Sequence, residues 1–456
     1  MKKKIHFNLG KTSFSFLVPY EAEILKMGKV NLLHNPEENI HEALSRPIGT
    51  PPVKTLVQHK LKQNPGSRAV VVISDSTRPV PYKEKQGILF PLVQHMMEAG
   101  LPSSRINILV ATGTHRPMSQ SELRDFLDPR IFELGIRIIN HDCRREDELV
   151  CVGQTELGGR ININRFYVQS DIKICTGLVE SHFMAGVSGG RKAVCPGIIS
   201  EDSTYLLHSG PVLAHPKAKD LVLHGNPVHE EALKVAQMAG CDMIVNVTLD
   251  SQYGLTGVFA GDLEKAHLKA VEKLSQYASI SVNKKYDLVI SHPGYVGVNH
   301  YQTAKAGVVC SSVLKDSGFC VLASYHTDTD PVGSPLYKKM LKLLGEKGAH
   351  SFEDLITDPS WTFVPEQWEA QMWCRLFKKI PFENLIYCTQ EISKSDFTWL
   401  PGTDARSLVP EARSLEQLTE HSVSWALDKL HQQGIEKPKI AVLLDGPYGI
   451  PVYKKS

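Results

Sequence analysis

The sequence lacks the long apolar and strongly charged segments that mark membrane proteins and nucleic-acid-binding proteins. No apolar run approaches the roughly 18 residues of a membrane-spanning helix, which excludes helical membrane proteins. The first residues lack the continuous apolar segment of a secretory signal peptide. The 456 residues include 51 basic and 49 acidic side chains, for a net charge of +2. Because there is no basic excess, we expect no binding to nucleic acid or to a membrane.

Paired cysteines are also missing. The nine cysteines are scattered along the chain, and none stands in a C-x-x-C pair. An odd, scattered set argues against a disulfide framework and against a zinc ribbon. This cysteine usage is typical of a reducing compartment, so we expect a cytoplasmic protein.

The common cofactor and metal motifs are absent as well. There is no G-x-x-x-x-G-K-[ST] sequence, no G-x-G-x-x-G after a strand and no H-E-x-x-H, which excludes the standard phosphate loop, the dinucleotide fingerprint and the zincin helix. Histidines are nevertheless dense at positions 208, 215, 224 and 229. A metal site there would need a single protein histidine together with ligands from another molecule.

What the sequence does contain is an alternation of short β-branched runs with helix-like segments. A chain of this length is expected to form two domains. The runs of the first series are 69–75, 106–113, 136–140, 171–179 and 242–250, and those of the second are 286–294, 318–325, 384–390 and 439–445. This pattern predicts α/β architecture, with a mostly parallel sheet flanked by helices in each domain. We expect domains at 1–270 and 271–456, with the active site in the cleft between them.

Polar side chains follow three strands of the first series. Asp75 and Arg78 come after the first strand, His115 after the second, and His182 after the strand at 171–179. Ligands bind beyond the carboxyl ends of the strands in doubly wound sheets, so these residues are candidates for one site. Helix capping is the alternative explanation for Asp75.

The stretch 180–192, ESHFMAGVSGGRK, places small residues directly before two basic ones. Ser188, Gly189 and Gly190 precede Arg191 and Lys192. Consecutive glycines before a helix start can direct several backbone N–H groups at one anion. A strand-to-helix turn without a ligand is the alternative interpretation. A partly buried lysine can also act as a nucleophile.

The second domain offers a further polar cluster after its first strand. Tyr301, Gln302 and Lys305 stand near an expected helix start. Lys305 is a candidate anchor for a carboxylate, or else an ordinary solvated helix lysine. Trp368 and Trp373 lie in the segment 365–373. Tryptophan side chains more often pack in a core than line a ligand site.

Two histidines on different loops, near cationic side chains, suit a reaction at a carbon that is approached from both faces. Racemisation has this symmetry. Removing the α-hydrogen of a 2-hydroxy acid as a proton is very unfavourable, so a hydride acceptor is needed. Because no nicotinamide fingerprint is present, the residues by themselves predict acid–base groups, an anion site and a missing electrophile.

Together these motifs resemble those of the nickel-dependent lactate racemase family across nearly the whole chain. They are SDSTRPVP (74–81), GTHRP (113–117), ESHFMAGVSGGRK (180–192), His208 and YQTAK (301–305). The resemblance implies a racemase or epimerase of 2-hydroxy acids. Homologues in the family act on malate, aryl-lactates and sugar acids as well as on lactate.

The resemblance also implies a cofactor, the nickel-pincer nucleotide (a nickel complex of pyridinium-3,5-bisthiocarboxylic acid mononucleotide). Lys192 would be joined to it through a thioamide, and His208 would be the protein's nickel ligand. Asp75 and the turn from Ser188 to Arg191 would contact the cofactor.

The remaining implied roles concern the substrate. His115 and His182 would be the paired general acid/base groups on its hydroxyl. The substrate-binding residues would be Arg78, Tyr301, Gln302, Lys305 and Trp368. The expected partners are a small 2-hydroxy acid and the enzymes that synthesise the cofactor. Two alternatives remain: an oxidoreductase that releases the 2-oxo acid, and a non-catalytic module that binds a nucleotide or a carboxylate.

Overall fold

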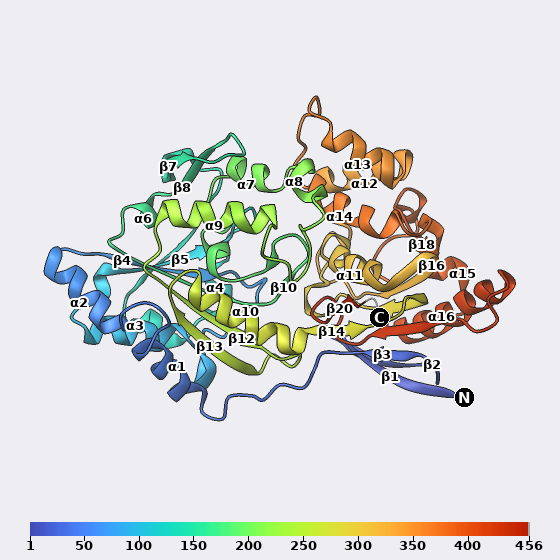
Figure 1. Ribbon diagram of the computed structural model, residues 1–456, viewed down its shortest axis with the longest axis horizontal. Coiled ribbons are helices and arrows are strands. Elements are labelled where there is room, and N and C mark those ends of the chain that lie inside the picture. The colour runs from blue at the N-terminus through green and yellow to red at the C-terminus, as the bar shows by residue number, and fades with distance from the viewer. Residues whose placement is uncertain (455–456) are drawn as a thin grey trace. The chain divides into compact units, whose positions relative to one another are not determined.

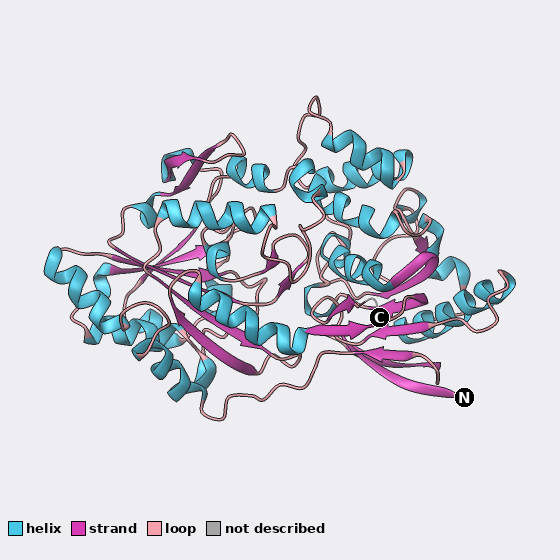
Figure 2. Ribbon diagram, viewed as in Figure 1, coloured by secondary structure: helices cyan, strands magenta, loops and turns pink. Residues whose placement is uncertain are grey.

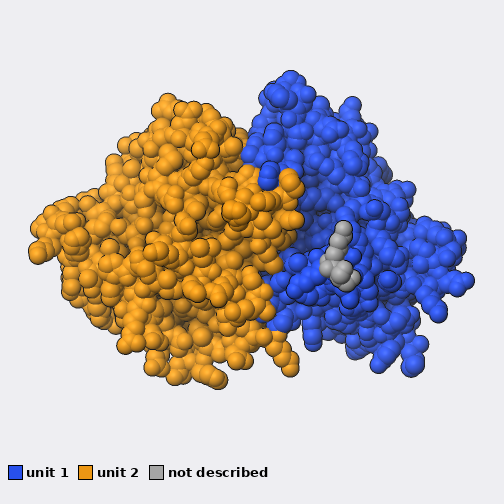
Figure 3. Space-filling model, in the orientation of Figure 1, with its two compact units in different colours: residues 1–28, 209–215, 277–456 blue, residues 29–208, 216–276 orange. Residues whose placement is uncertain are grey.

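A computed structural model describes residues 1–454, and the chain divides into two compact units (Figure 3). Unit 1 comprises Met1–Gly28, Ser209–His215 and the chain from Tyr277 onward, and unit 2 comprises Lys29–His208 and Pro216–Gln276. The units are therefore discontinuous in sequence, unlike the expected domains 1–270 and 271–456. The two short segments 1–28 and 209–215 account for most of the difference.

Unit 2 is built around a six-stranded sheet in the order β13-β12-β9-β4-β5-β6. The strands are β4 (Ala69–Ser74), β5 (Ile106–Ala111), β6 (Arg137–Asn140), β9 (Ile172–Leu178), β12 (Met243–Leu249) and β13 (Leu255–Gly261). All neighbours pair in parallel except β12 and β13. The central strands are rich in valine and isoleucine and buried on both faces, as expected when helices cover both sides of a parallel sheet.

Helices flank this sheet (Figures 1 and 2). They are α1 (Pro36–Ser45), α2 (Val53–Gln63), α3 (Leu89–Glu98), α4 (Gln120–Phe126), α5 (Pro129–Glu133), α6 (Arg165–Val168), α7 (Glu201–Leu207), α9 (Pro227–Ala239) and α10 (Lys265–Ala278). Two hairpins complete the unit: β7 (Leu149–Gln154) with β8 (Arg160–Asn164), and β10 (Ser181–His182) with β11 (Gly186–Val187). A capping box between Ser119 and Glu122 fixes the start of α4.

Unit 1 contains a second six-stranded sheet, in the order β18-β17-β16-β15-β19-β3, with every neighbour parallel. Its strands are β3 (Glu23–Leu25), β15 (Tyr286–Ser291), β16 (Leu314–Ala323), β17 (Leu385–Cys388), β18 (Thr403–Asp404) and β19 (Ile440–Leu443). Outside the sheet, β1 (Lys2–Asn8) pairs with β2 (Ser13–Pro19), and β14 (Ser279–Val282) with β20 (Ile450–Tyr453). The helices are α8 (Gly210–Ala214), α11 (His300–Val313), α12 (Pro335–Lys347), α13 (Ala349–Thr357), α14 (Gln367–Phe377), α15 (Ala405–Leu408) and α16 (Leu415–Gln432).

The predicted fold class, α/β with mostly parallel sheets flanked by helices, is confirmed in both units. Each unit has its own apolar core: one packs the unit 2 sheet against α1, α2 and α3, and the other packs the unit 1 sheet against α16. Within residues 1–454, no helix combines the length and apolar character needed to cross a membrane.

Candidate functional site

The first feature of the candidate site is a hydrogen-bonded pair at the carboxyl ends of two neighbouring strands. Asp75 follows β4 and His115 follows β5, and these strands pair in parallel up to their last residues. The His115 Nδ1–H group donates to Asp75 Oδ2 over 2.7 Å. The structure therefore brings these two predicted residues together at the sheet edge.

Asp75 holds its negative charge although it is only 5 % exposed. Burial by itself would raise the pKa of this carboxyl, but hydrogen bonds from His115 and Thr77 and the charge of Arg78 keep it below its ordinary value. An ionised Asp75 fixes the proton of His115 on Nδ1. The Nε2 atom of His115 then presents a lone pair that can accept a proton.

His182 accepts hydrogen bonds at Nδ1, whereas His115 donates one from the same atom. It lies in the short hairpin β10–β11, which follows β9. Its Nδ1 accepts hydrogen bonds from the backbone N–H groups of Met184 and Ala185, both at 3.2 Å. Because a neutral imidazole carries one proton, this arrangement places it on Nε2. His182 therefore presents a donor where His115 presents an acceptor.

An ion pair joins the loop after β4, which carries Asp75, to the loop after β9, which carries His182. Arg78 Nε lies 3.3 Å from Glu180 Oε1, and both side chains are mostly buried. Arg78 also donates from Nη1 to its neighbour's carbonyl, Thr77 O, at 3.1 Å. The partner role of Glu180 was missed from the sequence, although this acid stands directly after the strand-forming run.

The turn from Ser188 to Gly190 is packed tightly against the sheet. Ser188 Oγ donates to Leu178 O over 2.7 Å, and the Gly190 N–H donates to Asn246 Oδ1 over 2.7 Å. Gly190 has φ +53°, and a Cβ placed there would lie 2.9 Å from the ring of His267. Only glycine meets both conditions.

Arg191 directs its guanidinium toward its own loop. The side chain is 1 % exposed, and Nη2 donates to Ala185 O over 2.9 Å. Nη1 donates to Gly189 O at 3.3 Å and lies 3.2 Å from His267 Nε2. Burial lowers the pKa of Arg191 to about 9. These bonds brace the loop between His182 and Lys192, and a role in cofactor binding stays a prediction.

Lys192 and His208 lie near each other in unit 2. Lys192 is part of a 3₁₀ turn, Gly190–Ala193, and His208 ends α7. His208 Nδ1–H donates to Thr204 O over 2.9 Å. Burial lowers the pKa of His208 to about 4 despite that hydrogen bond, and the positive charge of Lys192 lowers it further. His208 is therefore neutral near pH 7.

A neutral histidine whose Nδ1–H is bonded to a carbonyl offers its Nε2 lone pair to a metal. Among residues 1–454, no group of three or more histidine, cysteine, aspartate or glutamate side chains is placed to hold a metal ion.

A second set of predicted residues gathers in unit 1. Asn299 caps α11 by accepting from the Gln302 backbone N–H at 2.9 Å. Lys305 Nζ donates to Gln302 Oε1 over 2.6 Å, one helical turn along α11. Trp368, on α14, donates its indole N–H to Tyr301 Oη over 2.6 Å. Trp373 donates instead to Tyr337, whose ring packs against that of Tyr301 with the ring centroids 5.0 Å apart.

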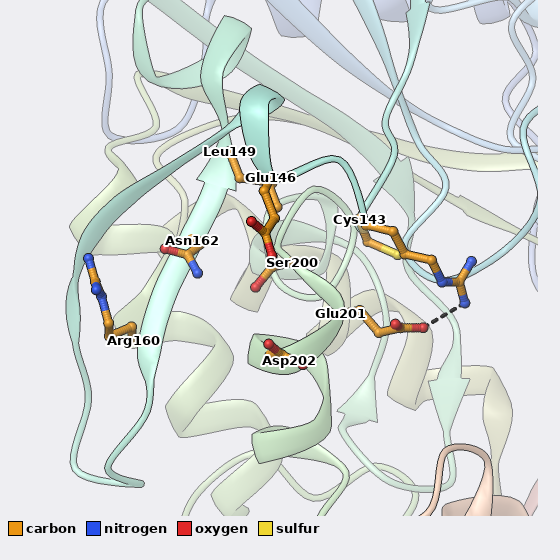
Figure 4. Close-up of a pocket in the computed structure, with 9 residues that line it drawn as sticks. Cys143, Glu146, Leu149, Arg160, Asn162, Ser200, Glu201 and Asp202 are labelled. Atoms are coloured by element: carbon orange, nitrogen blue, oxygen red, sulfur yellow. Dashed lines mark hydrogen bonds and ion pairs between the residues drawn. The ribbon is translucent and has the colours of Figure 1, made fainter.

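A polar cavity of about 500 Å³ in unit 2 contains none of the predicted residues (Figure 4). It lies beside the loop after β6 and the start of α7, and is lined by Cys143, Arg144, Glu146, Leu149, Arg160, Asn162, Ser200, Glu201 and Asp202. An ion pair of 2.6 Å joins Arg144 and Glu201 at its side. The sequence offered no motif that would have found it.

Known proteins resemble this chain in sequence and in structure. The profile of the Lactate racemase N-terminal domain matches residues 9–220. A lactate racemase from Thermoanaerobacterium thermosaccharolyticum is 30% identical over 377 residues, covering 82% of this chain and 85% of that protein. A lactate racemase from Lactiplantibacillus plantarum is 31% identical over 341 residues, covering 75% of this chain and 77% of that protein.

Two solved structures share the fold. The lactate racemase apoprotein from Thermoanaerobacterium thermosaccharolyticum superimposes with a TM-score of 0.82 at 28% identity, covering 99% of this chain and 100% of that one. A protein from Thermotoga maritima superimposes with a TM-score of 0.62 at 19% identity, covering 88% of this chain and 97% of that one.

Proposed function

The chain belongs to the lactate racemase family, and from this premise we propose that it interconverts the enantiomers of lactate or of a related 2-hydroxy acid. The observation that carries the proposal is the complementary pair of histidines. His115 presents a proton acceptor and His182 a proton donor, on loops of one sheet edge. A reaction that removes a hydroxyl proton from one enantiomer and restores one to the other needs both functions.

In this proposal His115 takes the hydroxyl proton through Nε2, and Asp75 stabilises the imidazolium that forms. His182 gives its Nε2 proton to the oxygen of the opposite enantiomer. The His115 imidazolium releases its extra proton to water and water returns a proton to His182, so both rings regain their starting state. The roles exchange in the reverse direction. The Arg78–Glu180 ion pair links the loop of His182 to the loop of Asp75, the hydrogen-bond partner of His115.

The proposed cofactor is the nickel-pincer nucleotide, which when bound supplies the hydride acceptor for the α-carbon. Lys192 would hold it covalently, and His208 would ligate the nickel through Nε2. The neutral state of His208, its bond to Thr204 and its nearness to Lys192 support this assignment. The absence of a self-sufficient protein donor set in residues 1–454 fits a cofactor that brings its own donors.

Substrate binding is assigned to Arg78 in unit 2 and to Tyr301, Gln302, Lys305 and Trp368 in unit 1. Arg78 and Lys305 would bind the carboxylate through charge-assisted hydrogen bonds. That the two sets meet in one cleft stays a prediction. The cytoplasm is the proposed location, with the cofactor-synthesis enzymes as partners, in keeping with nine free cysteines.

The test is a chiral assay on protein produced together with the cofactor-synthesis enzymes. Each pure enantiomer of lactate is supplied without an added electron acceptor, and the other enantiomer is measured by chiral chromatography. We expect both to approach a racemic mixture. Release of 2-oxo acid that depends on an external acceptor would establish the oxidoreductase instead. Tight lactate binding without turnover would establish the binding module.

A screen of malate, aryl-lactates and sugar acids in the same assay defines the substrate range. His59→Ala serves as the matched control for the histidine variants, because this histidine is exposed on α2. It should racemise as fast as the unsubstituted protein.

A further inference from the structure

A buried acid lies among the unit 1 residues assigned to substrate binding. Glu369 is the residue after Trp368 on α14, and it is 2 % exposed. Its Oε1 atom has no hydrogen-bond partner among residues 1–454. Buried carboxyl oxygens are almost always hydrogen-bonded, so an unsatisfied one at a functional site requires an explanation.

Ionisable groups from three directions face this carboxyl. Lys305 and Tyr301 approach from α11, Tyr337 from α12, and Glu366 from the segment just before α14. Burial raises the pKa of Glu369 to about 8, the charge of Lys305 opposes the rise, and Glu366 adds to it. Glu369 is therefore mostly protonated at pH 7 and loses its proton in the mildly alkaline range.

The state of this acid bears directly on the nearby lysine. A protonated Glu369 carries no charge, so the Lys305 ammonium keeps its full attraction for an external carboxylate. An ionised Glu369 is a second, internal carboxylate for the same ammonium. In a poorly hydrated site such a competitor acts strongly, because water screens it little.

We propose that Glu369 is a positioning residue for Lys305, and that loss of its proton diverts Lys305 from the substrate carboxylate to this internal acid. The inference rests on the proposed function, because it takes Lys305 to bind the substrate. It adds a residue that the sequence motifs did not single out, and it gives substrate binding an upper pH limit.

The experiment measures KM and kcat for lactate from pH 6.5 to 9 in the cofactor-loaded enzyme and in Glu369→Gln. Glutamine keeps the shape of the neutral acid but cannot ionise. At pH 9, one unit above the pKa, about nine in ten carboxyls are ionised, so the KM of the unsubstituted enzyme should rise about tenfold. The KM of Glu369→Gln should equal the unsubstituted value at pH 6.5 and rise much less by pH 9, with a similar kcat.

Glu366→Gln is the matched control. This variant keeps Glu369, so its KM should still rise with pH. The rise should begin at lower pH, because the negative charge of Glu366 no longer opposes ionisation of Glu369. An equal rise of KM in Glu369→Gln and in the unsubstituted enzyme would overturn the proposal.

A second measurement separates this inference from the proposed function. Thermal unfolding of the cofactor-free protein is followed from pH 6 to 9. The raised pKa means that the folded state holds the proton more tightly than the unfolded one, so stability falls as pH rises through 8. The unfolding midpoint should fall relative to Glu369→Gln. Parallel curves of unfolding midpoint against pH for the two proteins would refute the titration of Glu369, even if racemase activity is found. Diverging curves without racemase activity would refute the proposed function but support the titration.

Discussion

His115 and His182 lie on loops that follow different strands of one sheet, and their rings are held in opposite ways. His115 donates from Nδ1 to a buried carboxylate, Asp75. His182 accepts at Nδ1 from two backbone N–H groups of its own hairpin. The hydrogen-bond partner of Nδ1 decides whether Nε2 carries a proton. Two histidines can therefore begin the reaction in different roles, His115 as a proton acceptor and His182 as a proton donor.

Because of this difference, the two rings are not equally ready to accept a proton. An imidazolium at His115 is stabilised by the negative charge of Asp75. An imidazolium at His182 would bring an Nδ1–H group against two N–H donors. His182 can therefore accept a proton only after its contacts with Met184 and Ala185 loosen.

The largest expected effect comes from removing either ring. His115→Ala and His182→Ala should each lower turnover by roughly 10²–10⁴-fold, the usual range for general acid–base groups. In rapid-quench experiments, the two variants should fail to form the 2-oxo acid from opposite enantiomers. The enantiomer from which His115→Ala forms no 2-oxo acid should be the one from which the unsubstituted enzyme forms 2-oxo acid faster. Failure of both variants on the same enantiomer would contradict the assignment.

Asp75→Asn should have the next largest effect. The amide keeps a hydrogen-bonding group beside His115 but loses the charge that stabilises the imidazolium. Removal of such a supporting partner typically costs about 10–100-fold in activity. Asp142→Asn, at an exposed acid after β6, is the control and should leave kcat unchanged. Equal kcat in Asp75→Asn and the unsubstituted protein would show that the charge is not needed.

A backbone change should test the hairpin that holds His182. Gly186 has φ +77°, and a Cβ there would lie 2.0 Å from Val222 O. Gly186→Ala should displace the hairpin and lower the rate from the enantiomer served by His182 by about tenfold or more, as expected for a misplaced catalytic group. Gly158→Ala is the control, because its φ is +89° but the space around it is open. An equal loss of rate in Gly186→Ala and Gly158→Ala would contradict a specific role for the hairpin that holds His182.

The smallest effect concerns acid stability. The pKa of Asp75 is lowered in the folded protein, so its charge stabilises the fold above the ordinary value of 3.8. That contribution is lost as pH falls through the lowered pKa. The thermal unfolding midpoints of Asp75→Asn and the unsubstituted protein should therefore differ at pH 6 and converge toward pH 3. A constant difference across this range would contradict the ion-pair account.

Much of the fold could be predicted from local sequence. Buried parallel strands are continuous β-branched runs, which is why β4, β5 and β9 were found with their following polar residues. The strand β3 could not be found, because its three residues join the unit 1 sheet from the other end of the chain. Pairing across hundreds of residues leaves no local signature.

In the candidate site too, contacts between residues distant in sequence could not be predicted. Sequence motifs named Asp75, His115 and His182, but the tautomers depend on contacts that only the folded chain provides. Arg191 was predicted to contact the cofactor, and this stays a prediction. The sequence could not show that its guanidinium donates to the Ala185 carbonyl and lies beside His267, 76 residues away. Glu369 stands in a segment without a recognisable pattern, and its significance comes from burial beside Lys305.

Intact-protein mass spectrometry with nickel analysis tests whether this chain is a racemase that works through a cofactor it holds. The protein is produced with the cofactor-synthesis enzymes, as is its Lys192→Ala variant. We predict a mass increment that maps to Lys192, about one nickel per chain, and no covalent increment in the variant. An unmodified, nickel-free chain from cells shown to make the cofactor, or full loading of Lys192→Ala, would contradict the account.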